Sequence, residues 1–166
     1  FDEIFDNEVF DFLICNGVLH HTKNPYEGFL NIIKSLKKDG YIIVGLYNKI
    51  GRVRTKIRKY IYKILGKKMV LILDPVLRKT DKQSHDKINA WIKDQYMHPV
   101  ESTHTFDEIL NWFKKNDIEF INSIPQFSLS ETQDENFFNK KSEGTFVGRI
   151  LKQVIMLFSK FGSEGA

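Results

Sequence analysis

Two short apolar runs, separated by a segment with helical periodicity, constrain the fold of this chain more than any other feature. Residues 10–15 read Phe-Asp-Phe-Leu-Ile-Cys, and residues 41–46 read Tyr-Ile-Ile-Val-Gly-Leu. Each run has the length and composition of a buried strand in a parallel sheet. Between them, apolar residues recur at helical spacing from Tyr26 to Leu36. A strand, a helix and a strand this close together form a right-handed crossover, so we expect two parallel, neighbouring strands.

Both ends of the predicted helix carry local signals. Asn24 is suited to the N-cap, and Pro25 to the first helical position. Lys37 and Lys38 lie near the negative end of the helix dipole, and Gly40 can adopt the left-handed conformation that ends a helix. We therefore expect the helix to close at Gly40, directly before the second strand.

Residues 49–104 interrupt the alternation, because several helical patterns follow one another before the next strand. This segment is predicted to be an inserted helical lid. One of its helices has an apolar stripe made of Val53, Ile57, Tyr60, Ile61, Ile64 and Leu65. Its other face is predicted to be basic and to contain no acid: Arg52, Arg54, Lys56, Arg58, Lys59 and Lys63. Gly66 is expected to break this helix.

The last third of the chain resumes the alternation. Residues 105–108 are predicted to form a capping box, in which the Thr105 side chain accepts from the Glu108 amide and the Glu108 side chain accepts from the Thr105 amide. The helix that follows is expected to place Trp112 and Phe113 in the core. Residues 118–123 are predicted to be a third strand, and a last helix is expected over residues 147–158.

Composition excludes several classes of protein. With 166 residues, 42% apolar and 28% charged, the chain is expected to form one globular domain. Its single cysteine, Cys15, can form neither an internal disulfide nor a cysteine-rich zinc cluster, which favours a reducing, cytoplasmic location. No apolar run approaches the roughly 18 to 20 residues that a membrane span needs. The chain starts at Phe1 without a leader, so we expect it to be a fragment.

Residues 10–22 resemble the fourth strand and following loop of class I S-adenosylmethionine-dependent methyltransferases. In that family, Phe-Asp and apolar residues precede Val-Leu-His-His or Val-Leu-Glu-His, and this chain has Val18-Leu19-His20-His21. The resemblance continues through residues 36–40, which correspond to a Leu-Lys-Pro-Gly-Gly turn, although Lys38 and Asp39 depart from Pro-Gly. Residues 94–113 also resemble a subgroup that has a lid before the sixth strand.

The resemblance implies an α/β fold, a partial Rossmann-like sheet with strands 4, 5 and 6 of the seven-stranded order 3-2-1-4-5-7-6, and a helical lid insertion. Residues 1–48 would be the C-terminal half of the core, and residues 49–104 the lid. Residues 105–166 would contain the crossover helix, strand 6 and a C-terminal helix. The glycine-rich cofactor loop would precede Phe1, so we expect this chain alone to bind S-adenosylmethionine very weakly and to be inactive.

The resemblance also implies a function, which is methyl transfer from S-adenosylmethionine to a small-molecule acceptor. A contact of the basic helix with a membrane surface would suit a lipid or an isoprenoid acceptor. The residues implied in cofactor binding are Asn16, Gly17, Val18, Leu19 and His21. The residues predicted to contact the acceptor are Tyr47, Asn48, Tyr96, His98 and His104.

His20 or His21 is a candidate general base, because imidazole titrates near neutral pH. Their side chains are adjacent in sequence and expected to diverge, so no shared metal site is predicted.

Each of these assignments has a structural alternative. Asn16-Gly17 is common at plain turns, His20 and His21 can cap a helix or pack in a core, and residues 96–99 can equally anchor the lid.

The basic helix can be a solvated face, or it can contact an anionic membrane surface or RNA. Nucleic acid is disfavoured because only Tyr60 and Tyr62 are interleaved with the cations. The alternative function is therefore a non-catalytic module that docks on an anionic membrane or on RNA through residues 52–65.

Overall fold

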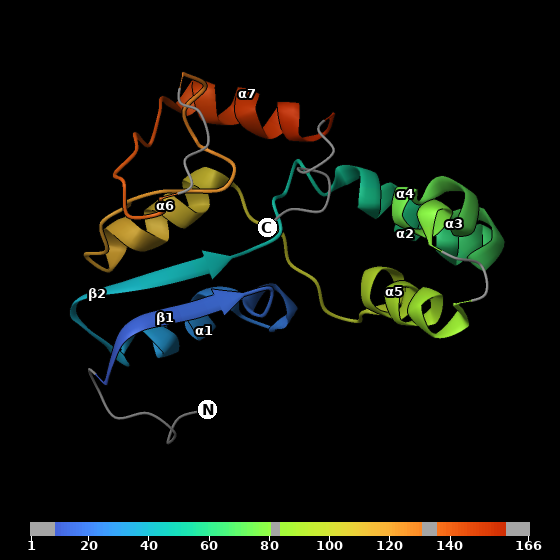
Figure 1. Cartoon of the computed structure of the whole chain (residues 1–166), viewed down its shortest axis with the longest axis horizontal. Coiled ribbons are helices and arrows are strands. Elements are labelled where there is room, and N and C mark those ends of the chain that lie inside the picture. The colour runs from blue at the N-terminus through green and yellow to red at the C-terminus, as the bar shows by residue number, and fades with distance from the viewer. Residues whose placement is uncertain (1–8, 81–83, 131–135, 159–166) are drawn as a thin grey trace.

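The computed structural model describes residues 9–80, 84–130 and 136–158 (Figure 1). The first part contains β1 (Phe10–Asn16), the short 3-10 helix η1 (Leu19–His21), α1 (Pro25–Ile33) and β2 (Leu36–Gly45). Four helices follow, namely α2 (Val53–Leu65), α3 (Lys67–Leu73), α4 (Pro75–Lys79) and α5 (His85–Met97). The last two are α6 (Phe106–Lys115) and α7 (Phe146–Met156).

The two strands form the parallel pair that the sequence predicts. β1 and β2 are in register from Phe12 opposite Tyr41 to Asn16 opposite Gly45. One face of the pair is covered by α1 and α6, in a core built from Cys15, Leu19, Phe29, Leu46 and Trp112. Trp112 is therefore confirmed as a core residue, 6% exposed, and burial raises the pKa of the Cys15 thiol.

The connection from α1 to β2 is shorter than predicted. α1 ends at Ile33, β2 already begins at Leu36, and Asp39 rather than Gly40 adopts the left-handed conformation, with φ of 63°. Gly40 is required for a different reason. A Cβ there would lie 2.9 Å from the Lys37 carbonyl oxygen and 3.1 Å from that of Asp11, so only glycine lets β2 approach β1 at this point.

The N-terminal caps largely follow the sequence. Asn24 accepts a hydrogen bond from the Glu27 amide, and Pro25 starts α1. Thr105 accepts one from the Glu108 amide, which confirms the forward half of the predicted capping box. The Glu108 carboxylate, however, accepts from the ring of His104 at 2.8 Å, so its observed partner differs from the one that the capping box assigns.

The helices of the predicted lid lie to one side of the sheet and have a core of their own (Figure 1). That core contains Val70, Leu77, Ile88, Ile92 and Tyr96. Gly66, with φ of 73°, separates α2 from α3 as predicted. The division of the chain at residues 48 and 104 stays a prediction.

The exposure of α2 differs from the expected one at several positions. Its apolar residues Ile57 and Ile64 are 56% and 71% exposed, whereas Arg52 and Arg58 are only 1% and 7% exposed. The prediction that all six basic residues cover one face opposite the apolar stripe is therefore wrong for these two arginines, which are buried. They are buried because the interior offers them polar partners: Arg52 bonds to Glu101, and Arg58 donates to Thr55 Oγ1 at 2.9 Å.

The predicted third strand at residues 118–123 does not form. This segment runs without a β-ladder, and its Ile121 carbonyl accepts from the Lys141 amide at 2.7 Å instead of from a neighbouring strand. Its apolar residue Phe120 is buried by stacking on Phe127, with ring centroids 5.1 Å apart. The last helix is confirmed as α7, although residues 159–166 lie outside the described part. Among the described residues, no helix is both long enough and apolar enough to pass through a bilayer.

Phe29 of α1 is fully buried in the core between the sheet and α6, so truncating its side chain should strongly reduce stability. Replacing Phe29 with Ala should lower the free energy of unfolding by about 3–5 kcal/mol, because a ring-sized cavity remains. The matched control Phe158→Ala, at a side chain that is 82% exposed, should change it by about 0.5 kcal/mol or less. Urea denaturation followed by circular dichroism measures both, and equal effects would contradict this description of the core.

Candidate functional site

The turn after β1 lies at the carboxyl edge of the parallel pair. Asn16 ends the strand, and the Gly17 amide donates to the Gly45 carbonyl of β2 at 3.1 Å. Gly17 has φ of 76°, a conformation that L side chains rarely adopt, and the space where its Cβ would lie is open. The turn is therefore held against β2 by this hydrogen bond, while its backbone stays accessible.

Gly45 is a residue of this site that the sequence analysis missed. A Cβ at Gly45 would lie 1.9 Å from Asn16 Oδ1, so the Asn16 side chain occupies the space that glycine leaves. A glycine inside an apolar strand is itself a signal of close approach, and it could have identified this position. Gly45 thus sets where the Asn16 side chain lies.

The five predicted cofactor residues divide into two groups. Asn16, Gly17 and Val18 are exposed, Val18 at 57%, and His21 is partly exposed. Leu19 is 2% exposed and belongs to the core of the sheet. Only Asn16, Gly17, Val18 and His21 are accessible to a ligand in this structure.

His20 is buried, with an exposure of 1%. Its ring stacks on Tyr47 at 3.6 Å, and neither ring nitrogen has a hydrogen-bond partner among the described residues. Burial, followed by the nearby charges of His21 and Arg52, lowers the pKa of His20 to about 4. His20 is therefore neutral at pH 7 and is enclosed by protein, which favours the packing role over the catalytic one.

His21 is better placed to act as a base. Its Nδ1 lies 3.2 Å from the Val100 carbonyl oxygen, and the Nδ1 of His98 lies 2.7 Å from the same oxygen. A carbonyl only accepts, so Nδ1 of each neutral ring carries the proton and Nε2 keeps its lone pair. The rings of His21 and His98 are 3.9 Å apart, which brings two predicted site residues together.

The expectation that the side chains of His20 and His21 diverge is wrong, because their ring centroids are 4.3 Å apart. The backbone of η1 turns both rings toward Tyr47, which lies 5.8 Å from His21.

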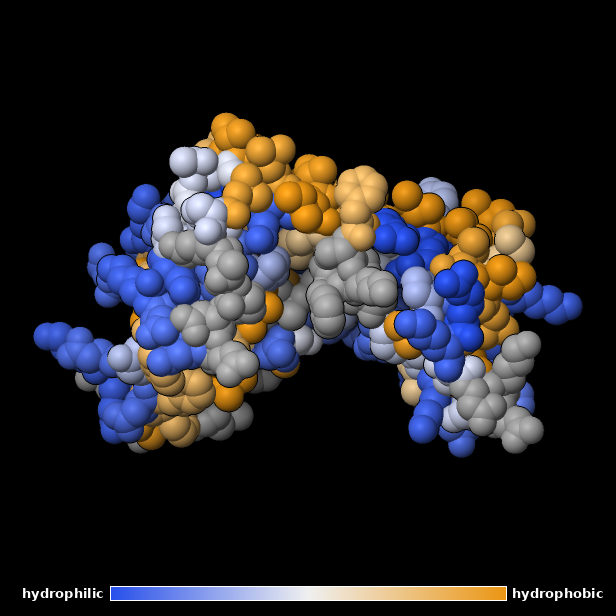
Figure 2. Space-filling model, turned by 45° about the horizontal axis from the view of Figure 1, so that its top comes forward, coloured by the Kyte–Doolittle hydropathy of each residue, from blue (hydrophilic) through white to orange (hydrophobic). Residues whose placement is uncertain are grey.

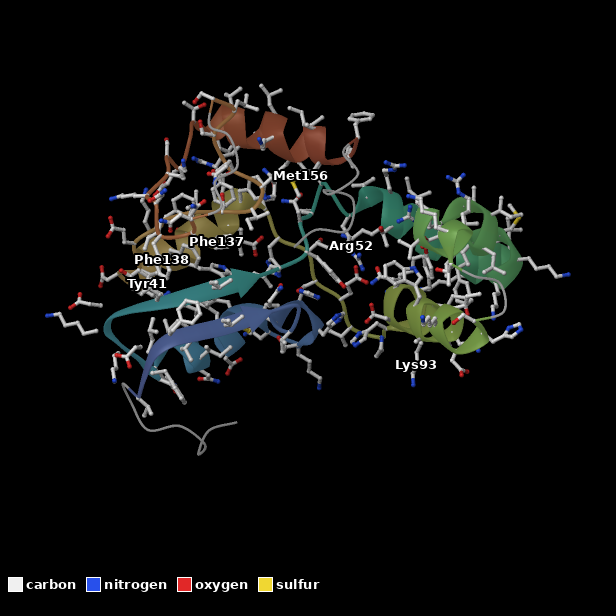
Figure 3. The ribbon with its side chains drawn as sticks, viewed as in Figure 1. Tyr41, Arg52, Lys93, Phe137, Phe138 and Met156 are labelled. Carbon is white, nitrogen blue, oxygen red and sulfur yellow. The ribbon has the colours of Figure 1, made fainter. Side chains whose placement is uncertain are left out.

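Arg52 connects this edge to the lid (Figure 3). Its guanidinium donates to Glu101 at 3.0 Å and to Gln95 at 2.8 Å, and its Cζ lies 3.6 Å from the centroid of the Tyr47 ring. Lys59 also donates to Glu101, at 3.2 Å. Burial by itself would raise the pKa of Glu101, but the charges of Arg52 and Lys59 outweigh it and hold this pKa below its usual value.

Three of the predicted acceptor residues are committed to other partners. Tyr96, 2% exposed, lies in the core of the lid and donates to the Asp74 carboxylate. Asn48 accepts from the amides of residues 50 and 51 and donates to Gln153 at 3.0 Å. His104 is 7% exposed and bonds through both ring nitrogens, to Glu108 and to Ser102. These side chains are not brought to an open surface, whereas Tyr47 and His98 lie beside His21.

Residues 98–104, which return from the lid, are held at the edge of the sheet by backbone hydrogen bonds. The Ser102 amide donates to the His20 carbonyl at 2.8 Å, and the His104 amide donates to the Tyr47 carbonyl at 2.8 Å. The Lys49 amide in turn donates to the His104 carbonyl at 2.8 Å. The carboxyl edge is thus assembled from residues 16–21, 47–52 and 98–104, which are distant in sequence.

A comparison with known protein families finds a match for the N-terminal part of the chain, which includes residues 16–21. Residues 2–44 match the family model described as a methyltransferase domain. The match confirms the resemblance to class I S-adenosylmethionine-dependent methyltransferases over the part of the chain that forms β1, η1, α1 and most of β2. It ends one residue before the glycine that faces Asn16.

The neutral, buried state of His20 predicts a specific pH dependence. Between about pH 6.5 and pH 4 the unfolded chain binds a proton at His20 that the folded chain does not bind, so the free energy of unfolding should fall as pH falls through this range. The loss due to His20 should be about 3 kcal/mol. The variant His20→Phe keeps an aromatic ring on Tyr47 and should lose this part of the pH dependence. Urea titrations from pH 8 to about pH 4 measure it.

The matched control is His85→Asn, at an exposed position on α5, which should leave the pH dependence unchanged. The same acid slope in His20→Phe as in the unmodified chain would show that His20 is not held neutral by folding.

Proposed function

We propose that this chain is the part of an S-adenosylmethionine-dependent methyltransferase that carries one wall of the cofactor site, and that the acceptor is a small molecule. One observation supports this proposal most strongly. The methyltransferase-domain match covers the parallel strands, and an accessible turn, Asn16 to Val18, lies at their carboxyl edge. In open α/β sheets, ligands bind outside the carboxyl ends of the strands.

The residues of this turn fit the proposed cofactor. Gly17 offers bare backbone with open space above it, the Asn16 side chain offers an amide, and Val18 offers an exposed apolar surface. S-adenosylmethionine would supply a methyl group that is already activated on a sulfonium. The protein therefore needs mainly to position the two reactants and exclude water. Asn16, Gly17 and Val18 would hold the cofactor, and Leu19 would support the turn from the core.

His21 would act on the acceptor. Because Val100 holds the proton on Nδ1, Nε2 of His21 is available to accept the proton of a hydroxyl or phenol group as the acceptor oxygen attacks the methyl carbon. Tyr47 and His98 lie beside His21 and would line the same space. His20 would position Tyr47 by stacking and would take no proton, because its pKa is about 4 and it is enclosed.

We also propose a cytoplasmic location. The single cysteine, Cys15, is buried in the strand and packs as an apolar residue, which suits a reducing compartment.

Cofactor binding at the turn is tested by Val18→Asp in the full-length protein. An acidic side chain at this exposed wall would replace an apolar contact, so the affinity for S-adenosylmethionine should fall by at least about tenfold, which corresponds to about 1.4 kcal/mol. The matched control is Val9→Asp, at a residue that is 44% exposed beside the opposite end of β1. Isothermal titration calorimetry measures both variants. Unchanged affinity in Val18→Asp, or an equal loss in Val9→Asp, would contradict the proposed site.

A further inference from the structure

Three helices at the same edge of the molecule, α7, α2 and α3, expose apolar side chains (Figure 2). On α7 and the turn after it, these side chains are Phe146, Val147, Ile150, Leu151, Val154, Ile155 and Phe158, which are 37–82% exposed. On α2 and α3 they are Val53, Ile57, Tyr60, Ile64, Leu65, Ile72 and Leu73, which are 40–71% exposed. We refer to these fourteen residues as the apolar ridge. Scattered apolar residues are common on protein surfaces, but contiguous patches of this kind mark interaction sites.

The two halves of the apolar ridge are joined where α7 ends and α2 begins. Arg54 Nη1 donates to the Leu157 carbonyl at 2.9 Å, so the first turn of α2 lies against the last turn of α7. A cation at this place also satisfies a carbonyl at the negative end of the α7 dipole. The ridge is therefore one surface that spans the core and the lid.

The two segments that carry the apolar ridge contain basic residues and no acidic ones. Residues 49–73 contain no Asp or Glu, and neither do residues 144–158. Five exposed cations lie on α2 and α3 near the ridge: Arg54, Lys56, Lys63, Lys67 and Lys68. On α2, Arg54 and Lys63 flank the apolar stripe on opposite sides, an arrangement typical of helices that lie in the interface of an anionic membrane. This complementarity of charge favours a lipid surface over a second copy of the same cationic face.

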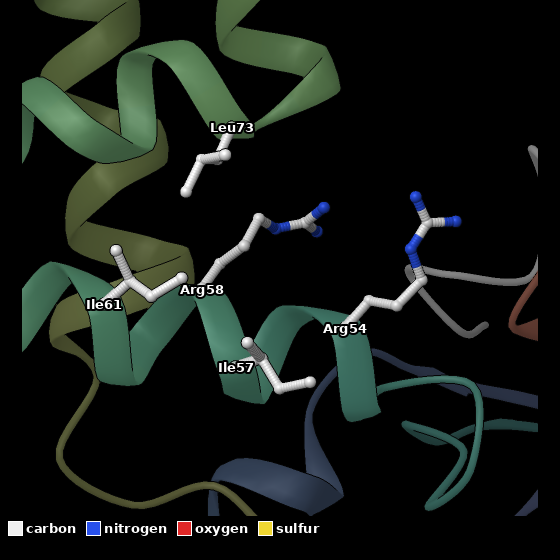
Figure 4. Close-up of a pocket in the computed structure, with 5 residues that line it drawn as sticks. All are labelled: Arg54, Ile57, Arg58, Ile61 and Leu73. Atoms are coloured by element: carbon white, nitrogen blue, oxygen red, sulfur yellow. The ribbon is translucent and has the colours of Figure 1, made fainter.

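A pocket of about 230 Å³ opens beside the apolar ridge, between α2 and α3 (Figure 4). It is lined by Arg54, Ile57, Arg58, Ile61 and Leu73. Both arginines extend from the same side of α2, and the other three side chains are aliphatic. Guanidinium groups recognise phosphate oxygens, and aliphatic walls suit the hydrocarbon that begins next to a phospholipid headgroup.

We propose that the apolar ridge binds the surface of an anionic phospholipid membrane. The exposed side chains of α2 and α7 enter the boundary between headgroups and acyl chains, and the exposed Arg54 binds a lipid phosphate beside the pocket. The surface differs from the one that the sequence suggested, because Arg52 is buried on Glu101 and Gln95 and takes no part. The inference does not depend on methyl transfer.

Vesicle cosedimentation of the purified chain tests this inference. The probes are vesicles of phosphatidylcholine alone and vesicles that also contain phosphatidylserine. We expect binding only to the second kind, and we expect added salt to weaken it. Ile64→Asp on α2 and Leu151→Asp on α7 should each reduce binding by about tenfold or more, since each places a charge in the apolar boundary. Both residues are exposed, so circular dichroism should show unchanged helix content.

Charge-reversal variants distinguish binding through the apolar ridge from binding that depends only on the net positive charge of the protein. Arg54→Glu and Lys63→Glu should each reduce vesicle binding by about tenfold, because each changes two units of charge at the surface. Lys93→Glu is the matched control, since Lys93 is exposed on α5, away from the ridge (Figure 3), and it should reduce binding far less.

Several results would overturn the proposal. Binding that does not depend on phosphatidylserine would do so, as would Ile64→Asp and Leu151→Asp variants that bind like the unmodified chain. Full competition by inorganic phosphate at low millimolar concentration would indicate a free-anion site. A dimer in light scattering that Leu151→Asp converts to a monomer, without any vesicle binding, would identify a second copy as the occupant.

Discussion

The buried guanidinium of Arg52 is the interaction on which the arrangement of sheet and lid depends. It lies at the start of α2, and it bonds to Gln95 at the end of α5 and to Glu101 in the returning segment. A buried charge is tolerated only when it is paired, and removing one partner of such a pair typically destabilises by about 3–5 kcal/mol. Arg52 therefore fixes the two ends of the lid relative to each other.

The same guanidinium determines the geometry of the candidate site. It packs on the ring of Tyr47, which stacks on His20, and the carbonyl of His20 holds the Ser102 amide. Through these contacts the position of the lid is coupled to η1 and to the turn that precedes it. His21 and His98, which share the Val100 carbonyl, are the accessible members of this assembly.

The burial of Arg52 and Arg58 also accounts for the exposed side of α2. Because Arg52 and Arg58 lie inward, other positions of the helix face outward, and these include the apolar residues Ile57 and Ile64. The exposed apolar face is thus a consequence of polar contacts in the interior. A surface of this kind on α2 and α7 needs a partner, and the cations around it match an anionic lipid surface.

Local sequence signals predicted the parts of the fold that depend on neighbouring residues. The strands around residues 12 and 43, the caps at Asn24 and Thr105, and the break at Gly66 all follow from short patterns.

The errors arose where partners are distant in sequence. Residues 118–123 have the composition of a strand, but a strand also needs a neighbouring strand for its ladder, and the described residues supply a loop contact instead. The inward position of Arg52 could not be predicted from α2 alone, because Glu101 lies 49 residues away.

The candidate site shows the same contrast between features that depend on neighbouring residues and features that depend on distant ones. The family pattern identified the turn of Asn16 and Gly17, and the structure places it at the carboxyl edge with an accessible backbone. The sequence could not separate His20 from His21, because their difference comes from Tyr47 on one side and Val100 on the other. Tyr96 lies in the lid core because its hydroxyl donates a hydrogen bond to Asp74, the N-cap residue of α4.

The most direct test is a crystal structure, with S-adenosylhomocysteine bound, of the methyltransferase of which we propose this chain is a part. Our account predicts that the amino-acid part of this product lies against Asn16, Gly17 and Val18, with its sulfur on the side of His21. A product bound elsewhere on the protein, with this turn still open to solvent, would contradict it.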